Sequence, residues 1–311
     1  GLMAVSWSLF QLWYASPLPF ILDFGKFIDV PARAIHLAFG MSLCFLAYPI
    51  LKSNRNKPIS LLDFILSIIS VIVTFYLVID YEGLVYRQGI LAKENIFGIN
   101  IPYELIIGSF GIILLLEATR RSIGTPLVII ALIFLLFSIF GQQMPDLISH
   151  QGLSLKRLVG YHWFGGEAIF GIPISVSVSF IFLFVLFGAT LDAAGGGKYF
   201  LNLAFALVGK MRGGPAKAAI LASGLTGLIS GSSVANTVTT GTFTIPIMKR
   251  TGLSPTKAGA IEVAASVNGQ IMPPIMGAAA FVMAELLGIS YFTVITHCLL
   301  YTSDAADDQA C

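Results

Sequence analysis

Charged residues are scarce in this chain of 311 residues. Asp, Glu, Lys and Arg make up 11% of it, whereas hydrophobic residues make up 56%. Soluble globular domains carry roughly a quarter of their residues as charges, so this composition excludes that class. The formal net charge of +2 is small and the basic residues are dispersed, which excludes nucleic acid as a partner. The composition predicts an integral membrane protein whose main surroundings are the lipid bilayer.

Cysteine, histidine and recognisable ends are also lacking. Cys44, Cys298 and Cys311 have no paired spacing, and the four histidines are scattered, so neither a disulfide framework nor a metal cluster is indicated. No cofactor is expected. The chain opens at Gly1 without a secretory signal, which indicates a fragment. Residues 301–311 follow an apolar run without a turn or cap, and we expect them to be a non-native or misread tail.

Long apolar runs, by contrast, are abundant. A helix needs about 20 apolar residues to cross the hydrocarbon core. Six runs approach this length, at residues 3–20, 34–51, 61–79, 103–118, 125–140 and 168–191. With a cytoplasmic N-terminus, most Lys and Arg residues fall on the inside, as the positive-inside rule requires, and loops 80–102 and 142–167 face outside. Glu117 with Arg120 and Arg121 predicts an interfacial ion pair.

The stretch 215–250 is too long for one crossing and too polar in its middle. It can hold two short helices separated by the Gly, Ser and Asn residues at 231–236. Basic residues flank both ends, which places both ends on the cytoplasmic side and predicts a re-entrant helical hairpin. Non-helical backbone is tolerated at membrane depth only where protein buries it or where it lines a watery cavity, so the tip is expected to be functional. The preceding segment 197–211 predicts an interfacial arm.

A second interruption follows within residues 255–288, whose length suits one transmembrane helix. Pro273 and Pro274 supply no backbone donor and disfavour helix before them, so the segment NGQIMPP predicts a broken helix. A re-entrant hairpin followed by a discontinuous helix is the pattern by which secondary transporters build their sites. The fold class expected is therefore an all-α, polytopic membrane protein.

Neutral oxygen donors gather at both interruptions. Hydroxyls and amide carbonyls satisfy a small hard cation, and half-helix N-termini can hold a carboxylate substrate, so we expect sodium and an organic anion here. The candidate substrate and ion residues are Ser230, Gly231, Ser232, Ser233, Asn236, Thr237 and Thr240 at the hairpin, and Ser266, Asn268, Gly269, Gln270, Pro273 and Pro274 at the broken helix. The candidate sodium ligands among them are Ser232, Ser233, Asn236, Ser266 and Asn268.

Several alternatives stay open at this point. Ser, Thr and Gly are also enriched where transmembrane helices pack closely. Glu262 could carry a proton in place of sodium, or could serve as a structural partner near Lys257. Ser232, Ser233 and His297 raise the possibility of an intramembrane serine hydrolase. A passive channel or a purely structural membrane subunit is a further class.

The segments GKMRGGPAKAAILASGLTGLISGSSVANTVTTGTFTIPIMKRTG and EVAASVNGQIMPPIMGAAAFVMAE resemble the large membrane subunit of tripartite ATP-independent periplasmic (TRAP) transporters. The resemblance covers about residues 120–300. Residues 1–121 are similar to the four-span small subunit, fused to residues 122–300 as the first half of the large subunit. The resemblance implies a bacterial inner-membrane permease, not an enzyme, with the N-terminus cytoplasmic.

The same resemblance implies sodium-coupled uptake of small organic acids by an elevator motion. A separate periplasmic substrate-binding protein, expected to be of the TAXI type, would deliver the solute. The large subunit of this family contains a second, inverted half, and the chain stops before it. Since inverted repeats enclose the site between their halves, we expect that this polypeptide cannot transport alone.

Overall fold

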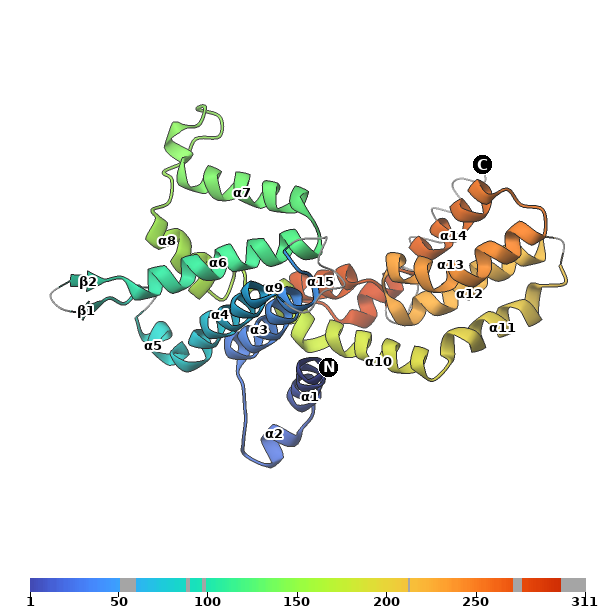
Figure 1. Cartoon of the computed structure of the whole chain (residues 1–311), viewed down its shortest axis with the longest axis horizontal. Helices are drawn as coiled ribbons and strands as arrows, with labels where there is room; N and C mark the ends of the chain where they lie inside the picture. Colours follow the sequence, from blue (N-terminus) through green and yellow to red (C-terminus); the bar gives the residue numbers. More distant parts are fainter. Residues whose placement is uncertain (51–59, 88–89, 97–98, 212, 271–275, 298–311) are drawn as a thin grey trace. The chain divides into compact units, whose positions relative to one another are not determined.

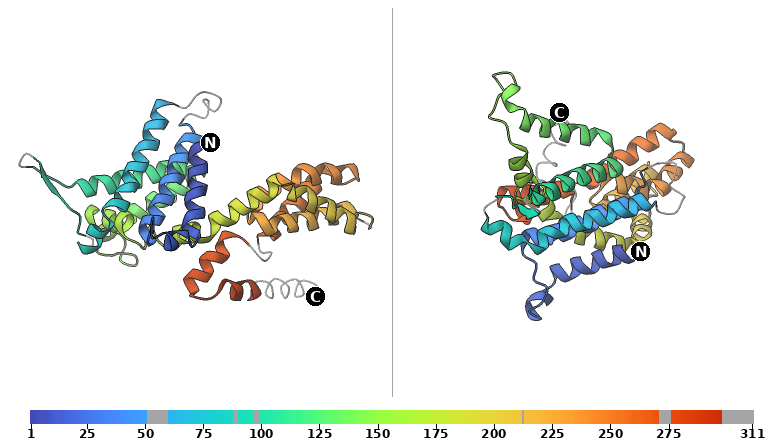
Figure 2. Two further views of the ribbon diagram at one scale, coloured as in Figure 1. Left: turned by 90° about the horizontal axis from the view of Figure 1, so that it is seen from below. Right: turned by 60° about the vertical axis from the view of Figure 1, so that its left-hand side comes forward.

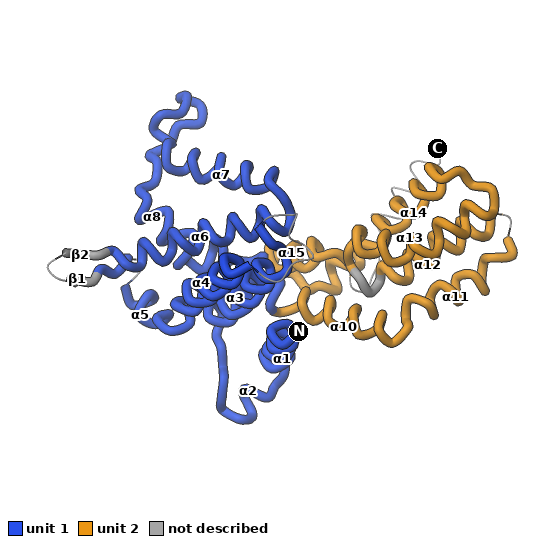
Figure 3. The backbone as a smooth tube through the Cα atoms, in the orientation of Figure 1, with its two compact units in different colours: residues 1–178 blue, residues 179–311 orange. Residues whose placement is uncertain are grey.

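The computed structural model describes residues 1–50, 60–87, 90–96, 99–211, 213–270 and 276–297, apart from the side chains of residues 94–101 and 228–230. These residues form helices and connecting turns, with one short pair of strands (Figure 1). The chain divides into two compact units, Gly1–Val178 and Ser179–Cys311 (Figure 3). The expected all-α fold is confirmed. The prediction of a non-native tail lies outside the described residues.

The first unit is built around the neighbouring helices α3 and α4, with α6 packed against both. Its strands form an antiparallel hairpin in which Asn95 pairs with Asn100. The elements are α1 (Leu2–Ala15), α2 (Leu18–Ile21), α3 (Asp29–Ala47), α4 (Leu61–Ile79), α5 (Tyr81–Tyr86), β1 (Glu94–Ile96), β2 (Ile99–Ile101), α6 (Tyr103–Ser122), α7 (Thr125–Ile139), the 3₁₀ turn η2 (Gly141–Gln143), α8 (Leu155–Val159), the π-helical turn η3 (Gly160–Phe164) and α9 (Ile172–Val176).

The second unit is a helical bundle in which α12, α13 and α14 lie side by side (Figures 1 and 2). A π-helical turn, η4 (Ser177–Ile181), leads into it. Its helices are α10 (Phe182–Ala193), α11 (Gly196–Val208), α12 (Gly214–Ser230), α13 (Ser233–Arg250), α14 (Pro255–Gly269) and α15 (Ala278–Leu287), followed by a short helix, Tyr291–His297.

Three helices of the described chain are long and apolar enough to cross a membrane: α3, α4 and the continuous helix Ile172–Ala193. The bent pair formed by α15 and Tyr291–His297, with an angle of 115° between its members, is a fourth candidate. Each of the six predicted spans overlaps at least one helix. However, α1 and α7 contain only 14 and 15 residues, and α6 carries charged residues near both ends.

The distribution of polar and apolar residues on helix α4 is the one expected of a helix in a membrane. Its buried face is largely polar, and its exposed face is apolar, which reverses the pattern of a soluble helix. The buried face follows helical spacing and comprises Asp63, Ser67, Ser70, Val73, Thr74 and Leu77. The exposed face comprises Leu61, Phe64, Ile68, Ile72, Phe75 and Ile79. Because lipid offers no hydrogen bonds, polar groups gain from facing α3, where Ser67 Oγ bonds to Ser42 Oγ.

Arg121 ties three helices of the first unit together. Its guanidinium donates to Asp63 Oδ1 on α4 at 2.6 Å and to Glu117 Oε1 on its own helix at 2.8 Å. It also lies over the Phe45 ring of α3, 4.9 Å from the ring centroid. The predicted pairing of Glu117 with Arg120 and Arg121 is confirmed. The bond to Asp63, in which both side chains are 2% exposed, was not predicted.

Replacing Arg121 by Ala is expected to lower the free energy of unfolding by about 3–5 kcal/mol, because Asp63 then stays buried without its partner. The measurement is the unfolding midpoint of the purified protein in detergent. Arg120→Ala is the matched control, since Arg120 is 40% exposed and pairs only with Glu117 among the described residues. Equal midpoints for the two variants would contradict the structural role of the buried pair.

Candidate functional site

The hairpin predicted at residues 215–250 is present as two helices, α12 and α13, that pack against each other. The chain reverses at Gly231, whose φ of 58° lies in the left-handed region that favours glycine. Ser232 then caps α13, because its Oγ accepts the N–H of Ala235 at 3.3 Å. The Gly and Ser residues of the tip therefore end one helix and begin the next.

The second predicted break is also present. Helix α14 ends at Gly269 and α15 begins at Ala278, and the N–H of Gly277 donates to the carbonyl of Gln270 at 2.6 Å. The prolines held responsible for the break, Pro273 and Pro274, lie outside the described residues.

The hairpin and the second interrupted segment meet at two glycines: Gly227, about one turn before the end of α12, and Gly269, where α14 ends. A Cβ added to Gly227 would lie 2.5 Å from the Cα of Gly269, and a Cβ added to Gly269 would lie 2.9 Å from the Cα of Gly227. No side chain fits between the backbones of α12 and α14 there. The loop after α14 also reaches the hairpin tip, since a Cβ on Gly277 would lie 3.5 Å from the carbonyl oxygen of Gly231. The hairpin and the interrupted segment that follows it therefore contact each other.

Beside this glycine contact, Asn236 joins the three helices of the bundle. It is 1% exposed, and its Nδ2 donates to the carbonyl and the Oγ of Ser223 on α12, at 2.8 and 3.0 Å. Ser223 Oγ in turn bonds to Ser266 Oγ on α14 at 3.1 Å. Within the described chain, the remaining Asn236 oxygen, Oδ1, is buried without a partner. A buried acceptor left in this way carries a desolvation cost of about 1–3 kcal/mol, which a bound cation or water would remove.

Glu262 continues the same network. Its carboxylate is completely buried and accepts hydrogen bonds from Thr240 and Thr244 of α13 and from Ser266, the last at 3.3 Å. Gly241 leaves room for it, because a Cβ there would lie 3.2 Å from Glu262 Cγ. No basic side chain pairs with Glu262 among the residues described. The network therefore holds a carboxylate surrounded by neutral groups.

The predicted site residues differ in burial and in hydrogen bonding. Asn236, Thr240 and Ser266 lie in one buried network, and Gly269 forms the glycine contact beside it. Asn268 is exposed, one residue before the buried Gly269. Ser233, Thr237 and Gln270 are half-buried, and Thr237 bonds back to the carbonyl of Ser233 at 2.8 Å. The side chain of Ser230 lies outside the described residues.

Two members of the network, Ser223 and Thr244, were missed by the sequence analysis. A signal for Thr244 was available: Asn236, Thr240 and Thr244 recur at intervals of four, which places them on one face of a helix. Ser223 lies in the apolar part of α12, far from the polar tip, and no feature of the neighbouring sequence distinguishes it.

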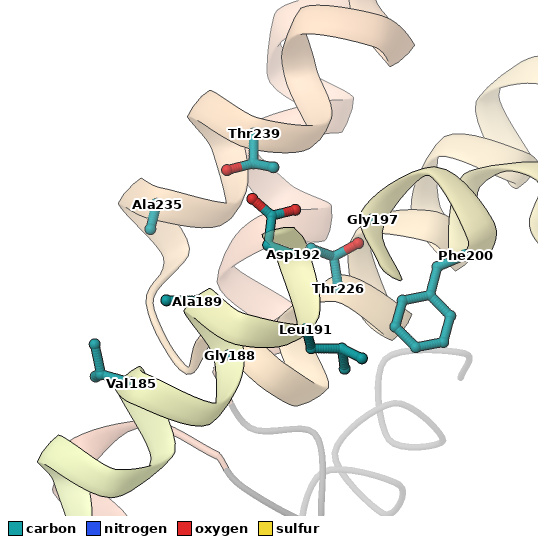
Figure 4. A pocket seen from close by; sticks show the side chains of 10 residues that line it. All are labelled: Val185, Gly188, Ala189, Leu191, Asp192, Gly197, Phe200, Thr226, Ala235 and Thr239. Atoms are coloured by element: carbon teal, nitrogen blue, oxygen red, sulfur yellow. The ribbon is translucent and has the colours of Figure 1, made fainter. Parts of the chain in front are cut away.

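A cavity lies on the other side of the hairpin, within the second unit. Its volume is about 220 Å³, and α10, α11, α12 and α13 all contribute to its lining. Its polar lining comes from Asp192, Thr226 and Thr239, and Figure 4 shows the Asp192 carboxylate pointing towards Thr239. A neighbouring cavity of about 450 Å³ shares Asp192 and Thr239 and also reaches Thr240 of the network. The network thus has open space close to one of its members.

Gly269→Ala is expected to destabilise the protein by about 1–3 kcal/mol, because the added methyl group must push α12 and α14 apart. Gly259→Ala on the same helix is the control: nothing lies within 4 Å of its Cβ, and alanine favours helix by up to about 1 kcal/mol. The unfolding midpoints in detergent should therefore move in opposite directions. Similar midpoints would show that the close approach is not needed for stability.

Comparison with known proteins gives consistent results. A protein of Salmonella typhimurium called uncharacterized protein YgiK is 34% identical over 173 residues, which are 56% of this chain and 35% of that protein. A putative TRAP transporter large permease protein of Haemophilus influenzae is 31% identical over 116 residues, and the 2,3-diketo-L-gulonate TRAP transporter large permease protein YiaN of Escherichia coli is 29% identical over 116 residues. Each of these two matches covers 37% of this chain and 27% of the relative.

The chain thus spans about a third or less of the length of these curated relatives. No solved structure matches it with significance. Residues 110–301 match the DctM component of the tripartite ATP-independent periplasmic transporters, a match that covers more than half of the chain. The chain therefore belongs to the TRAP transporter family, in which DctM is the large permease component.

Proposed function

We propose that this chain is part of the permease of a sodium-coupled secondary transporter, which imports small organic acids delivered by a periplasmic substrate-binding protein. The observation that carries the proposal is the close contact of the two interrupted segments at Gly227 of α12 and Gly269 of α14, beside the buried Asn236. Secondary transporters use discontinuous helices of this kind to form substrate and ion sites. The family consists of transporter permeases, which are not enzymes.

Sodium suits the uncharged oxygens at the breaks. Asn236 Oδ1 is a buried acceptor with no partner among the described residues. Ser223 Oγ is hydrogen-bonded both to Asn236 and to Ser266 Oγ, so it links these two residues. The last turn of α12 adds carbonyl groups, which carry the partial negative charge of a helix C-terminus. We propose that Asn236 and Ser266 hold the ion, with Ser232, Ser233 and Asn268 as further ligands.

The organic acid is proposed to bind at the helix N-termini beside the same breaks, which carry partial positive charge. Helix α13 begins at Ser233 and α15 begins at Ala278, and each N-terminus presents backbone N–H groups with partial positive charge. A carboxylate can be held there without Lys or Arg. The substrate path would then run along Gly231, Thr237, Gln270 and the two prolines, Pro273 and Pro274.

Placement in the membrane follows from the charged ends of the bundle. Lys217 lies near the start of α12, Lys249 and Arg250 end α13, and Lys257 lies near the start of α14, whereas the breaks lie at the opposite ends of these helices. We propose that the basic end faces the cytoplasm, as the positive-inside rule favours, and that the hairpin is re-entrant. The N-terminus would be cytoplasmic, in a bacterial inner membrane.

The partners and the motion are part of the proposal. The outside loops 80–102 and 142–167 would dock a binding protein of the TAXI type, and a transport domain would move against a scaffold as an elevator. The matched residues make up only 27–35% of these relatives, so the transport activity is proposed for the permease as the cell makes it.

Proton coupling through Glu262 is the second candidate. It is favoured by the complete burial of Glu262 and by the lack of a basic partner among the described residues. A buried ionisable side chain in a membrane segment is often part of a proton relay. The two candidates differ in the gradient that drives uptake.

The proposal predicts uptake that requires both a sodium gradient and the binding protein. The measurement is uptake of a radiolabelled organic acid into proteoliposomes that contain the permease as the cell makes it, with sodium replaced by choline at fixed pH. Asn236→Ala should reduce initial uptake by about tenfold or more, since a lost polar contact in a buried site costs about 1–3 kcal/mol.

Thr251→Ala is the matched control, because Thr251 is an exposed residue beyond the basic end of α13. Its uptake should equal that of the wild type. Uptake that persisted in choline and followed a proton gradient would replace sodium by a proton. Uptake without any gradient dependence would indicate a channel.

A further inference from the structure

Among the described residues, the carboxylate of Glu262 has no countercharge, whereas other buried acids of this protein do. Asp63 is paired with Arg121, and the completely buried Glu104 is paired with Arg87. Glu262 is equally buried, yet its partners in the described chain are three hydroxyl groups. An isolated buried charge costs several kcal/mol, so a positive charge at this place would be strongly bound.

The threonine hydroxyl groups around Glu262 also carry fewer hydrogens than the acceptor oxygens that they contact. Thr240 Oγ1 lies within hydrogen-bond distance of two acceptors, the carbonyl of Asn236 at 2.7 Å and Glu262 Oε1, but it carries one hydrogen. Thr244 Oγ1 likewise lies between the carbonyl of Thr240 at 3.0 Å and Glu262 Oε2. Each threonine therefore leaves one contact between two acceptors, which repel each other. A cation among these oxygens would turn this repulsion into attraction.

The oxygens come from two helices in a compact arrangement. Glu262 and Ser266 are four residues apart on α14, and Asn236, Thr240 and Thr244 are four residues apart on α13. They supply carboxylate, hydroxyl and amide oxygens, which are the ligands of small hard cations. The unpartnered Asn236 Oδ1 is a second, independent sign, because a proton on Glu262 would leave it unsatisfied.

We propose that Glu262 is the anionic ligand of a monovalent cation site, formed with Thr240, Thr244 and Ser266 between α13 and α14 and extending to Asn236. This inference rests on the proposed function, and it changes the character of the ion site from neutral to charged. With an anionic ligand, the bound sodium is electrically compensated within the bundle. Asn236 and Ser266 then connect the cation to the helix breaks.

The test measures sodium binding separately from transport. The purified permease, as the cell makes it, is titrated with sodium chloride against choline chloride at constant pH and ionic strength, and its thermal unfolding midpoint is followed. A ligand that binds the folded state raises the midpoint by mass action. The wild type should show a saturable rise, and Glu262→Gln should require about 100-fold more sodium or show no rise.

Glu285→Gln is the matched control, because it makes the same chemical change at an exposed position on α15. It should keep the sodium response of the wild type. If Glu262→Gln fails to fold, Thr244→Val replaces it, since valine keeps the shape of threonine and removes only the hydroxyl. Thr244→Val should weaken the response by about tenfold, the value of one buried polar contact.

An unchanged sodium response in Glu262→Gln, or in Thr244→Val where that variant replaces it, would overturn the inference. Sodium-driven uptake would then still support the proposed function, with the ion held elsewhere. A wild type that shows no sodium response would also overturn the inference. Uptake that nevertheless follows the sodium gradient would leave the proposed function standing, whereas uptake driven by protons would remove both.

Discussion

The close approach of α12 and α14 at Gly227 and Gly269 is the constraint on which the polar interior of the second unit depends. Because the two backbones nearly touch, short side chains can bridge the helices. Ser223 and Ser266 join α12 to α14 through their hydroxyls at 3.1 Å, a contact that longer helix separations would break. Asn236 then reaches both its backbone and side-chain partners on α12. Small residues at a helix interface thus create the polar site as well as the packing.

Both units turn their polar groups inward, but they satisfy them differently. In the first unit, buried acids meet arginines: Asp63 bonds to Arg121 at 2.6 Å, and Glu104 bonds to Arg87 and to the Tyr76 hydroxyl. These pairs fix helices whose opposite faces are apolar. In the second unit, Glu262 meets hydroxyls alone among the described residues. Fixed pairs suit a scaffold, whereas a carboxylate without a fixed partner suits an exchangeable cation.

Much of this architecture could be predicted from local sequence. The span at residues 61–79 matches α4, and the glycine at position 231 ends α12, because both depend on apolar length and backbone conformation. Contacts between distant residues could not be predicted. The bond between Asp63 and Arg121 joins residues 58 apart, and nothing local distinguishes it from the predicted bond to Glu117. The break predicted within residues 268–274 is present, because α14 ends at Gly269. The side that Asn268 faces could not be predicted, and its side chain is exposed.

The geometry of the hairpin also bears on coupling. At the tip, α12 ends at Ser230 and α13 begins at Ser233, so carbonyl groups of one helix and N–H groups of the next lie within a few residues. These groups carry partial charges of opposite sign, which favour a cation and an anion respectively. In the proposed mechanism, the two ligands therefore bind near each other, and each lowers the electrostatic cost of the other. Such attraction raises the affinity for both by the same factor, as linkage requires. A solute anion and its coupling ion can then bind together at helix breaks that contribute no net charge. Glu262 would balance the charge of the cation.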